Sequence, residues 1–183
     1  MTPHVPPTQR AAVNVDIDGL YLYDRIHGYQ GGSGNAADFD PATANPVMWT
    51  RGVTRFLDLF DRTKVKATFF VVAQDLAHPD AQAVLREVLA AGHEVGNHSL
   101  THPYDLSRRD RLAIGDELSA AKRRLEDFCG TDVKGFRAPG YVLSDDLREA
   151  IVDTGHVYSS SRFPCPPYQA AKAAVIGAYT VLG

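Results

Sequence analysis

The segment His98-Ser-Leu-Thr-His102 places two imidazoles four residues apart, a spacing at which both can lie on one face of a helical turn and bind one ion. Spacing alone is weak evidence, because the chain has seven histidines and such pairs are often surface or capping residues. Here the pair follows a predicted strand and precedes Pro103, so it lies in a loop of the kind in which sites collect. We therefore treat His98 and His102 as candidate metal ligands.

A second candidate group is Asp16-Ile-Asp18, at the end of the apolar segment 11–17 that we expect to form a buried strand. We expect the alternation of side chains at the strand end to point the two carboxylates in different directions, so that one can bind a metal ion while the other accepts a proton. In the alternative reading, Asp16 caps a turn and Asp18-Gly19 forms one.

A third candidate is Arg137, which ends a predicted strand and is followed by Ala-Pro-Gly-Tyr, residues that fix an irregular backbone. A buried arginine needs a carboxylate partner, and its two-pronged guanidinium could hold Asp16 ionised and oriented. Taken alone, the same residues fit an arginine at the rim of the domain before a plain turn equally well.

These groups need a scaffold that brings the ends of separate segments together. Apolar runs predict strands, and helical spacing of apolar residues between Gly, Pro and Ser predicts helices. The predicted strands cover residues 11–17, 66–72, 93–97, 133–137 and 157–160. The predicted helices begin near Thr50, at Pro79, at a capping box formed by Ser107 with Asp110, and after Ser144, and the last three end at Gly92, Gly130 and Gly155. This alternation predicts an α/β fold of parallel strands whose polar ends converge.

Composition narrows the classes of protein. With 183 residues, 44% hydrophobic and 22% charged, the chain fits one domain over residues 11–183 after a flexible, Pro-rich tail at 1–10. A net charge of −3 and a pI near 6.1 provide no basic field, so nucleic acid is not an expected partner. No apolar run has membrane-spanning length and no leader is apparent, so we expect a cytoplasmic protein. Cys129 and Cys165 are expected to be structural or free thiols.

Residues 19–47 form a long irregular segment with several glycines, which is typical of a functional or disordered loop. Trp49 and Tyr141 could stack on sugar rings or simply pack in the core. Residues 170–183 are expected to begin a further helix.

Four segments in order, VDIDG, KATFFVV, GHEVGNHSLTHPYDL and GFRAPGY, resemble motifs of the polysaccharide deacetylases, also called the NodB-homology or carbohydrate esterase family 4 group. The resemblance covers residues 12–165. Its D-x-D form is that of the branch that includes peptidoglycan deacetylases and allantoinase-like amidohydrolases. The family fold implied is a distorted (β/α) barrel of seven strands, which we expect to be incomplete in this chain.

The resemblance implies a role for each motif residue. Asp18, His98 and His102 would bind one divalent ion, zinc in the first place, with nickel, cobalt or manganese as alternatives. Asp16 would be the general base and Arg137 would orient it. A backbone N–H at Gly140 or Tyr141 would bind the oxyanion. Two imidazoles and one carboxylate leave an open position on a zinc-class ion, which fits amide hydrolysis.

One family motif has no counterpart. The family's late Leu-His pair, whose histidine protonates the leaving amine, is missing, because no histidine follows His156. His156 resembles part of the fifth strand instead, and His93 is expected to be structural or to support the site. We therefore expect an N-terminal fragment of a longer enzyme, of reduced activity. Three functions remain open: removal of N-acetyl groups from a glycan such as peptidoglycan, hydrolysis of a small amide, imide or formyl group, and non-catalytic metal or carbohydrate binding.

Overall fold

The computed structural model describes residues 11–22, 40–162, 165–168, 170–171 and 174. The predicted tail, His4, His27 and most of the long loop therefore lie outside the described residues, as does most of the helix expected at 170–183. Within the described part, no helix combines the length and the apolar character that crossing a membrane requires.

Five parallel strands form one sheet in the order β1-β2-β3-β4-β5, as the alternation predicts. Their bounds are β1 Val13–Ile17, β2 Ala67–Val71, β3 Glu94–Asn97, β4 Gly135–Phe136 and β5 Tyr158–Ser159. The last two strands are shorter than predicted. Arg137 and Ser160, directly after them, still donate their N–H groups to the carbonyls of Asn97 and Phe136, but the Ala138 N–H goes to the Ser161 hydroxyl, so the backbone ladder of β4 ends there.

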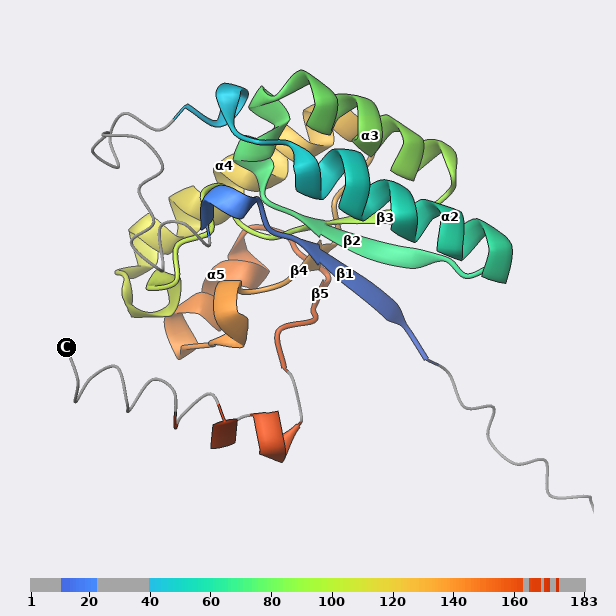
Figure 1. The fold of residues 1–183 in the computed structure, drawn as a ribbon. Helices are drawn as coiled ribbons and strands as arrows, with labels where there is room; N and C mark the ends of the chain where they lie inside the picture. Colours follow the sequence, from blue (N-terminus) through green and yellow to red (C-terminus); the bar gives the residue numbers. More distant parts are fainter. Residues whose placement is uncertain (1–10, 23–39, 163–164, 169, 172–173, 175–183) are drawn as a thin grey trace, which may run out of the picture.

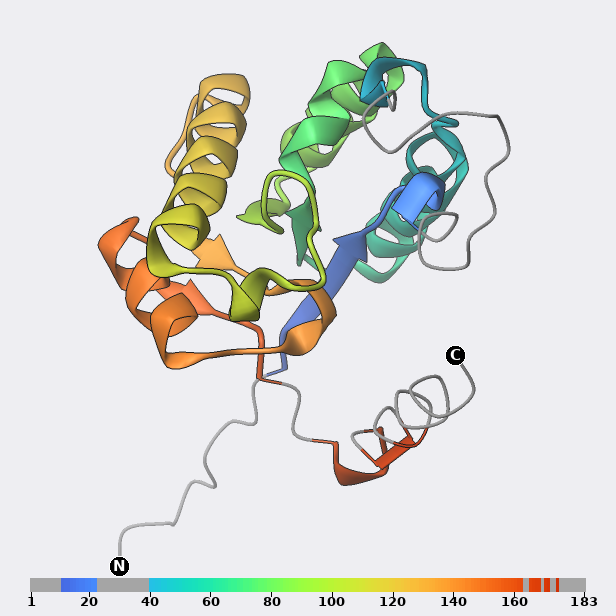
Figure 2. The same cartoon turned by 90° about the vertical axis from the view of Figure 1, so that its left-hand side faces the viewer.

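Four α-helices of the described part connect consecutive strands, and Figures 1 and 2 show them one after another around the outside of the curved sheet. Their bounds are α2 Thr54–Thr63, α3 Pro79–Ala90, α4 Arg111–Cys129 and α5 Asp145–Asp153. The π-helical turn η3, Met48–Val53, leads directly into α2, so the first helix begins slightly earlier than predicted.

Polar side chains fix where the helices begin. The Ser144 hydroxyl accepts the Leu147 N–H at the start of α5, as predicted. The predicted capping box at Ser107 is wrong: Ser107 lies in the separate turn η5, Leu106–Arg108, and α4 is capped by Asp110, which accepts the Ala113 N–H. Only the residue that directly precedes a helix can accept the N–H two or three residues later with its side chain. Asp110 has that position and Ser107 does not.

Two apolar clusters hold the sheet to its helices. One packs β2 against α2 and α3, with Phe69, Val71 and Leu85 fully buried. The other lies between α4, α5 and β4 and includes Leu118 and Phe136. Each such side chain stabilises the fold by about 2 kcal/mol relative to full exposure. The strands whose ends carry the polar residues are therefore packed firmly against the helices.

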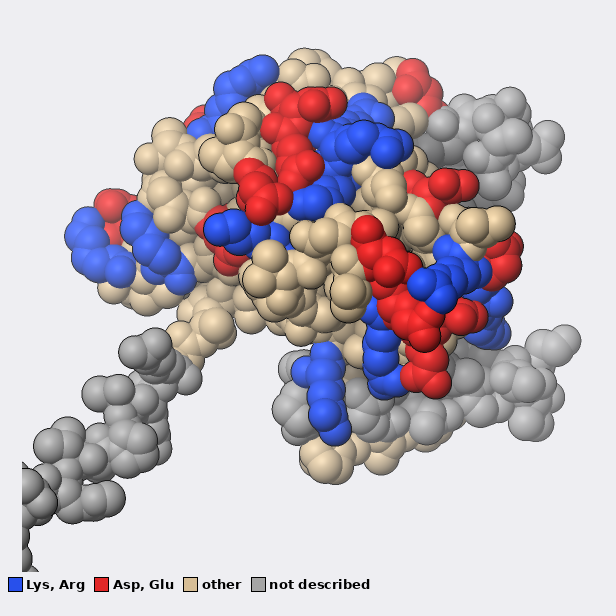
Figure 3. All heavy atoms as spheres, turned by 180° about the vertical axis from the view of Figure 1, so that it is seen from behind, with Lys and Arg blue, Asp and Glu red and all other residues tan. Residues whose placement is uncertain are grey.

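The sheet is open: among the described residues β1 and β5 are its edges, and no closed barrel forms. On the face shown in Figure 3, acidic and basic side chains are interleaved. That pattern is ordinary for a solvated surface and differs from the continuous basic area that binds nucleic acid. Both cysteines are free thiols, as expected.

Candidate active site

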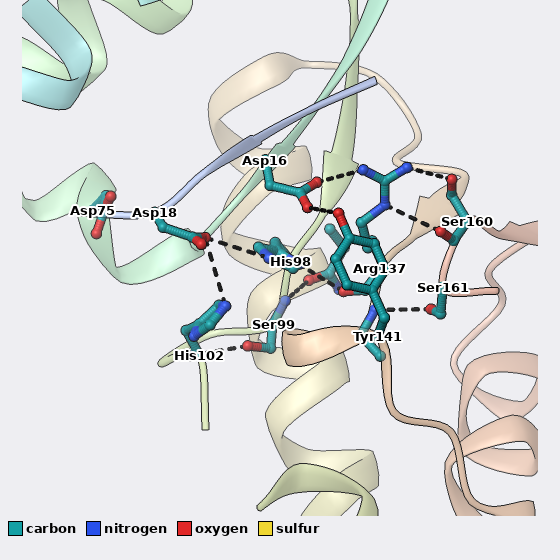
Figure 4. Close-up of polar contacts among 12 residues, drawn as sticks. Asp16, Asp18, Asp75, His98, Ser99, His102, Arg137, Tyr141, Ser160 and Ser161 are labelled. Carbon is teal, nitrogen blue, oxygen red and sulfur yellow. Dashed lines mark hydrogen bonds and ion pairs between the residues drawn. The ribbon is translucent and has the colours of Figure 1, made fainter. Parts of the chain in front are cut away.

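The predicted site residues come from the same edge of the sheet. Asp18 follows β1, His98 follows β3, Arg137 follows β4 and Ser160 follows β5. All five strands are parallel, so these positions lie at their carboxyl ends, and Figure 4 shows the side chains gathered there. The structure thus brings the Asp, His and Arg motifs together.

The two histidines converge through a loop and not through a helical turn, so that part of the prediction is wrong. Residues 98–102 have no helical structure, and Ser99 and His102 adopt left-handed backbone angles, with φ of 68° and 55°. The Asn97 side chain accepts the Ser99 N–H at 2.8 Å, and the Ser99 hydroxyl accepts the His102 N–H at 3.0 Å. These two bonds hold a backbone that would otherwise be strained.

Neighbouring elements hold the same loop. Glu117 of α4 accepts both the N–H and the hydroxyl of Thr101, at 2.6 and 2.8 Å. The loop after β2 donates backbone N–H groups to the carbonyls of Ser99 and Leu100. The histidine loop is therefore bonded on two sides, which restricts where His98 and His102 can point.

Asp18 and the two imidazoles form a three-ligand cluster. The Asp18 Oδ1 lies 3.4 Å from the His98 Nε2 and 3.6 Å from the His102 Nε2, and one ligand atom from each residue lies within 4.8 Å of the others. The His98 Nδ1 is 2.7 Å from the Arg137 carbonyl, which can only accept, so Nδ1 carries the proton. In the neutral form of His98, the Nε2 lone pair is then directed at the centre of the cluster.

The cluster has the features expected of a cation site. The Asp18 Oδ1 is buried and has no hydrogen-bond partner among the described residues, an arrangement that is unfavourable unless something else satisfies it. Burial would raise the pKa of Asp18, but its interactions with the imidazoles of His98 and, more weakly, His102 lower it below its ordinary value. Burial, with help from His98, lowers the pKa of His102 to about 4. An ionised carboxylate and neutral imidazoles are the forms that bind a divalent ion.

Asp16, by contrast, has a partner on each carboxylate oxygen. The Arg137 Nη1 donates to Oδ1 at 2.6 Å, and the Tyr141 hydroxyl donates to Oδ2 at 2.7 Å. The two aspartates differ in direction because β1 ends at Ile17, so Asp18 has left the strand. Strand alternation is the wrong reason for this, since residues two apart in a strand share a face.

Arg137 is itself tightly held, with only 7% of its surface exposed. Its Nε donates to the Ser160 carbonyl at 3.1 Å and its Nη2 to the Ser160 hydroxyl at 2.5 Å. The guanidinium also lies 4.4 Å above the centre of the Phe70 ring. Ser160 was not among the predicted site residues, and its only signal in the sequence is a run of three serines after an apolar strand.

The Pro-Gly-Tyr turn η6, Pro139–Tyr141, carries left-handed residues at Gly140 and Tyr141, with φ of 64° and 60°. This backbone directs the Tyr141 ring toward Asp16 (Figure 4). The Tyr141 N–H donates to the Ala138 carbonyl at 3.0 Å. As an oxyanion donor it would have to share this bond, so the assignment to Gly140 or Tyr141 stays a prediction.

His93, His156 and Trp49 make structural contacts away from the cluster. The His93 Nδ1 accepts the Ala67 N–H at 3.2 Å, and the His156 ring bonds the side chains of Asn97 and Thr154. Trp49 is only 3% exposed, so it packs in the core and is not available to stack on a sugar.

A cleft of about 350 Å³ opens beside the cluster. It is lined by Leu22, His102, Pro103, Tyr104, Asp105, Arg108 and Arg109. The half-exposed Tyr104 ring packs edge-on against His102, with ring centres 4.7 Å apart. The cleft therefore combines a candidate metal ligand, an aromatic surface and charged groups, a combination that suits a polar substrate.

The sequence model of the polysaccharide deacetylase family matches residues 39–159, which include both site histidines and Arg137. A chitooligosaccharide deacetylase from Bradyrhizobium sp. (strain ANU 289) is 36% identical over 92 residues, 50% of this chain and 41% of the relative. A peptidoglycan deacetylase from Helicobacter pylori is 25% identical over 150 residues, 82% of this chain and 48% of the relative. The chain thus spans half the length of these relatives or less.

Solved structures give the same fold. A family 4 carbohydrate esterase from Streptomyces lividans, solved in complex with acetate, superposes with a TM-score of 0.58 at 19% identity, over 82% of this chain and 62% of that one. The family match covers well over half of the chain, and its histidine and arginine motifs meet at one edge of the sheet. This chain therefore belongs to the polysaccharide deacetylase family.

Proposed function

We propose that this chain carries the metal site of a hydrolase that removes N-acetyl groups from a glycan, with Asp18, His98 and His102 binding one zinc-class ion. The observation that carries the proposal is the Asp18 Oδ1, which faces two imidazole Nε2 atoms at 3.4 and 3.6 Å and has no hydrogen-bond partner among the described residues. The donor set also fits, since two nitrogens and one oxygen leave room for water and substrate.

When bound, such an ion polarises an amide carbonyl and brings the pKa of water to roughly 7. The histidine loop and its bonds to Asn97 and Glu117 keep two ligands in place. The Arg137 carbonyl fixes the proton of His98 on Nδ1, which leaves Nε2 as the ligand atom.

Asp16 is the base in this proposal. A carboxylate has about four acceptor positions, and Arg137 and Tyr141 use one on each oxygen, so Asp16 retains lone pairs that can take a proton from water. The two donors fix the orientation of the carboxylate before substrate arrives, which is the preorganisation that proton transfer needs.

The substrate in this proposal is a glycan with N-acetylated amino sugars. Relatives named as chitooligosaccharide and peptidoglycan deacetylases support this class. The cleft beside His102 is open at the surface, and the half-exposed Tyr104 in its lining supplies an aromatic group of the kind on which sugar rings stack.

The test is an assay of acetate release from N-acetylglucosamine oligomers by the zinc-loaded chain, beside small amides and imides such as allantoin. We expect release from the oligomers that Asp16→Asn abolishes and that the matched surface variant Asp58→Asn retains. Activity on the small amides alone would favour the small-amide branch. Zinc binding without hydrolysis of either class would favour a non-catalytic role and contradict the proposal.

A further inference from the structure

Asp75 is the one buried carboxylate among the described residues, with 4% of its surface exposed. It follows β2 in the turn η4, Ala73–Ala77, at the same edge of the sheet as the site. In the view of Figure 4, Asp18 lies between Asp75 and Arg137. Nothing in the chemistry assigned to Asp16 and Asp18 accounts for a third carboxylate here.

Each Asp75 oxygen accepts a hydrogen bond from a different segment. The Tyr21 hydroxyl donates to Oδ1 at 2.5 Å, and the Trp49 indole N–H donates to Oδ2 at 3.0 Å. The Gln74 side chain in turn donates to the Tyr21 oxygen at 2.8 Å. Asp75 thus joins the turn after β1, the start of η3 and the loop after β2.

The bond to Tyr21 acts directly on the turn that carries Asp18. A Cβ atom on Gly19 would lie 2.2 Å from the Tyr21 ring, so that ring is packed against the backbone next to Asp18. The Leu22 N–H donates to the Gly19 carbonyl at 3.0 Å and closes the turn. Movement of the Tyr21 ring would therefore move residues 18–19.

The charges are consistent with this proximity. Burial raises the pKa of Asp75, and the negative charge of Asp18 raises it further, which places the two carboxylates within electrostatic reach. Burial and the neighbouring Asp75 raise the pKa of Tyr21 above its usual range, so the phenol remains a donor. A second carboxylate this close costs free energy unless a cation lies near both.

We propose that Asp75 is a positioning residue, which acts through Tyr21 to hold the Asp18 carboxylate toward His98 and His102, so that metal affinity depends on the Asp75–Tyr21 bond. This proposal rests on the metal site of the proposed function. Asp75 touches neither ion nor substrate. Partners behind metal ligands are typically worth about 10–100-fold in metal affinity, and this is the effect we expect.

The test measures zinc affinity by competition with a chromophoric chelator in the whole chain. Tyr21→Phe removes the hydroxyl while the ring stays over Gly19, and Asp75→Asn replaces one of the two acceptor oxygens. Tyr158→Phe is the matched control, because Tyr158 lies on β5 and its hydroxyl bonds Thr68 and Glu94. We expect both site variants to weaken zinc binding about tenfold and the control to bind like the unchanged chain.

A second readout separates positioning from simple packing. Trp49 is the only tryptophan of the chain and donates to Asp75, so its fluorescence reports the network. We expect zinc to change this emission in the unchanged chain and to change it less in Tyr21→Phe, while the unfolding temperature of the metal-free protein stays close to that of the unchanged chain.

The outcomes are distinct. If the unchanged chain binds zinc and both site variants bind it equally tightly, the positioning role is overturned while the metal site stands. If Tyr21→Phe loses zinc affinity only in proportion to lost thermal stability, the network is structural and the proposal fails. If the unchanged chain binds no zinc, the proposed function fails first, and this inference with it.

Discussion

Asp16 and Asp18 are two residues apart, yet their carboxylates have opposite hydrogen-bonding environments. Asp16 accepts hydrogen bonds on both oxygens, from Arg137 and Tyr141. Asp18 has a buried oxygen without such a partner, directed at two imidazoles. A carboxylate with a donor on each oxygen is fixed in orientation and still keeps lone pairs, whereas a buried carboxylate oxygen that faces two imidazole nitrogens without a donor is placed as a ligand to a cation would be. The comparison teaches that hydrogen-bond partners, and not residue type, distinguish the carboxylate we propose as the base from the one we propose as the ligand.

The largest expected effect is the loss of zinc binding when Asp18 or one of the two histidines beside it is replaced. His98→Ala, His102→Ala or Asp18→Asn removes one of the three proposed ligands, so each should reduce zinc affinity by more than about 100-fold, given the several kcal/mol that a ligand contributes. Metal analysis after dialysis should give about one zinc per unchanged chain and little in the variants. Equal metal content in all of these proteins would contradict the assignment.

The next largest effect is expected from replacing Asp16, which should lower activity and leave zinc binding unchanged. Asp16→Asn keeps the hydrogen-bonded shape but cannot accept the proton, so acetate release should fall by about 10²–10⁴-fold while zinc content stays near that of the unchanged chain. Both quantities are measured on the same preparations. If Asp16→Asn empties the site and Asp18→Asn does not, the two roles are reversed.

A smaller effect is expected from Arg137→Lys. Lysine keeps the charge but lacks the fork that bonds Asp16 and Ser160 together, so the base becomes less well oriented. We expect kcat to fall by about tenfold, with KM and zinc content little changed. Unchanged kcat would show that charge alone suffices, and loss of zinc would tie Arg137 to the metal side.

Tyr141→Phe should have the smallest effect on activity, a few-fold loss, because Arg137 still holds Asp16. This variant should also change how the free energy of unfolding depends on pH. Burial and the bond to Asp16 raise the pKa of Tyr141 to about 12. Since the folded pKa lies above the unfolded value of about 10, the stabilisation is present below pH 10 and is lost as pH rises toward 12.

Denaturant unfolding between pH 9 and 12 checks this sign. The unchanged chain should lose more unfolding free energy over that range than Tyr141→Phe, which has no phenol to ionise. A steeper loss in the variant would mean that the phenol is not protonated and donating to Asp16, and the asymmetry between the two aspartates would rest on Arg137 alone.

Much of the scaffold could be predicted because its signals are local. Pro79 after the capping His78, Ser144 before α5 and the left-handed Gly130 after α4 each act on adjacent backbone. The wrong prediction at the start of α4 also has a local cause. Two residues near α4 could have capped it, and Asp110 does so because it directly precedes the helix.

The sequence by itself determined the alternation of strands and helices and the placing of Asp, His and Arg motifs after strands, since periodicity and strand direction need no distant partner. Only the tertiary structure decided that His98 and His102 meet through a left-handed loop, that Ser160 holds Arg137, and that Asp75 lies behind Asp18. The contacts of Ser160 and Asp75 join residues far apart in the chain, and the histidine loop is held from outside by Glu117 and by the loop after β2. Their hydrogen bonds depend on atoms placed within a few ångströms by packing, which no local pattern encodes.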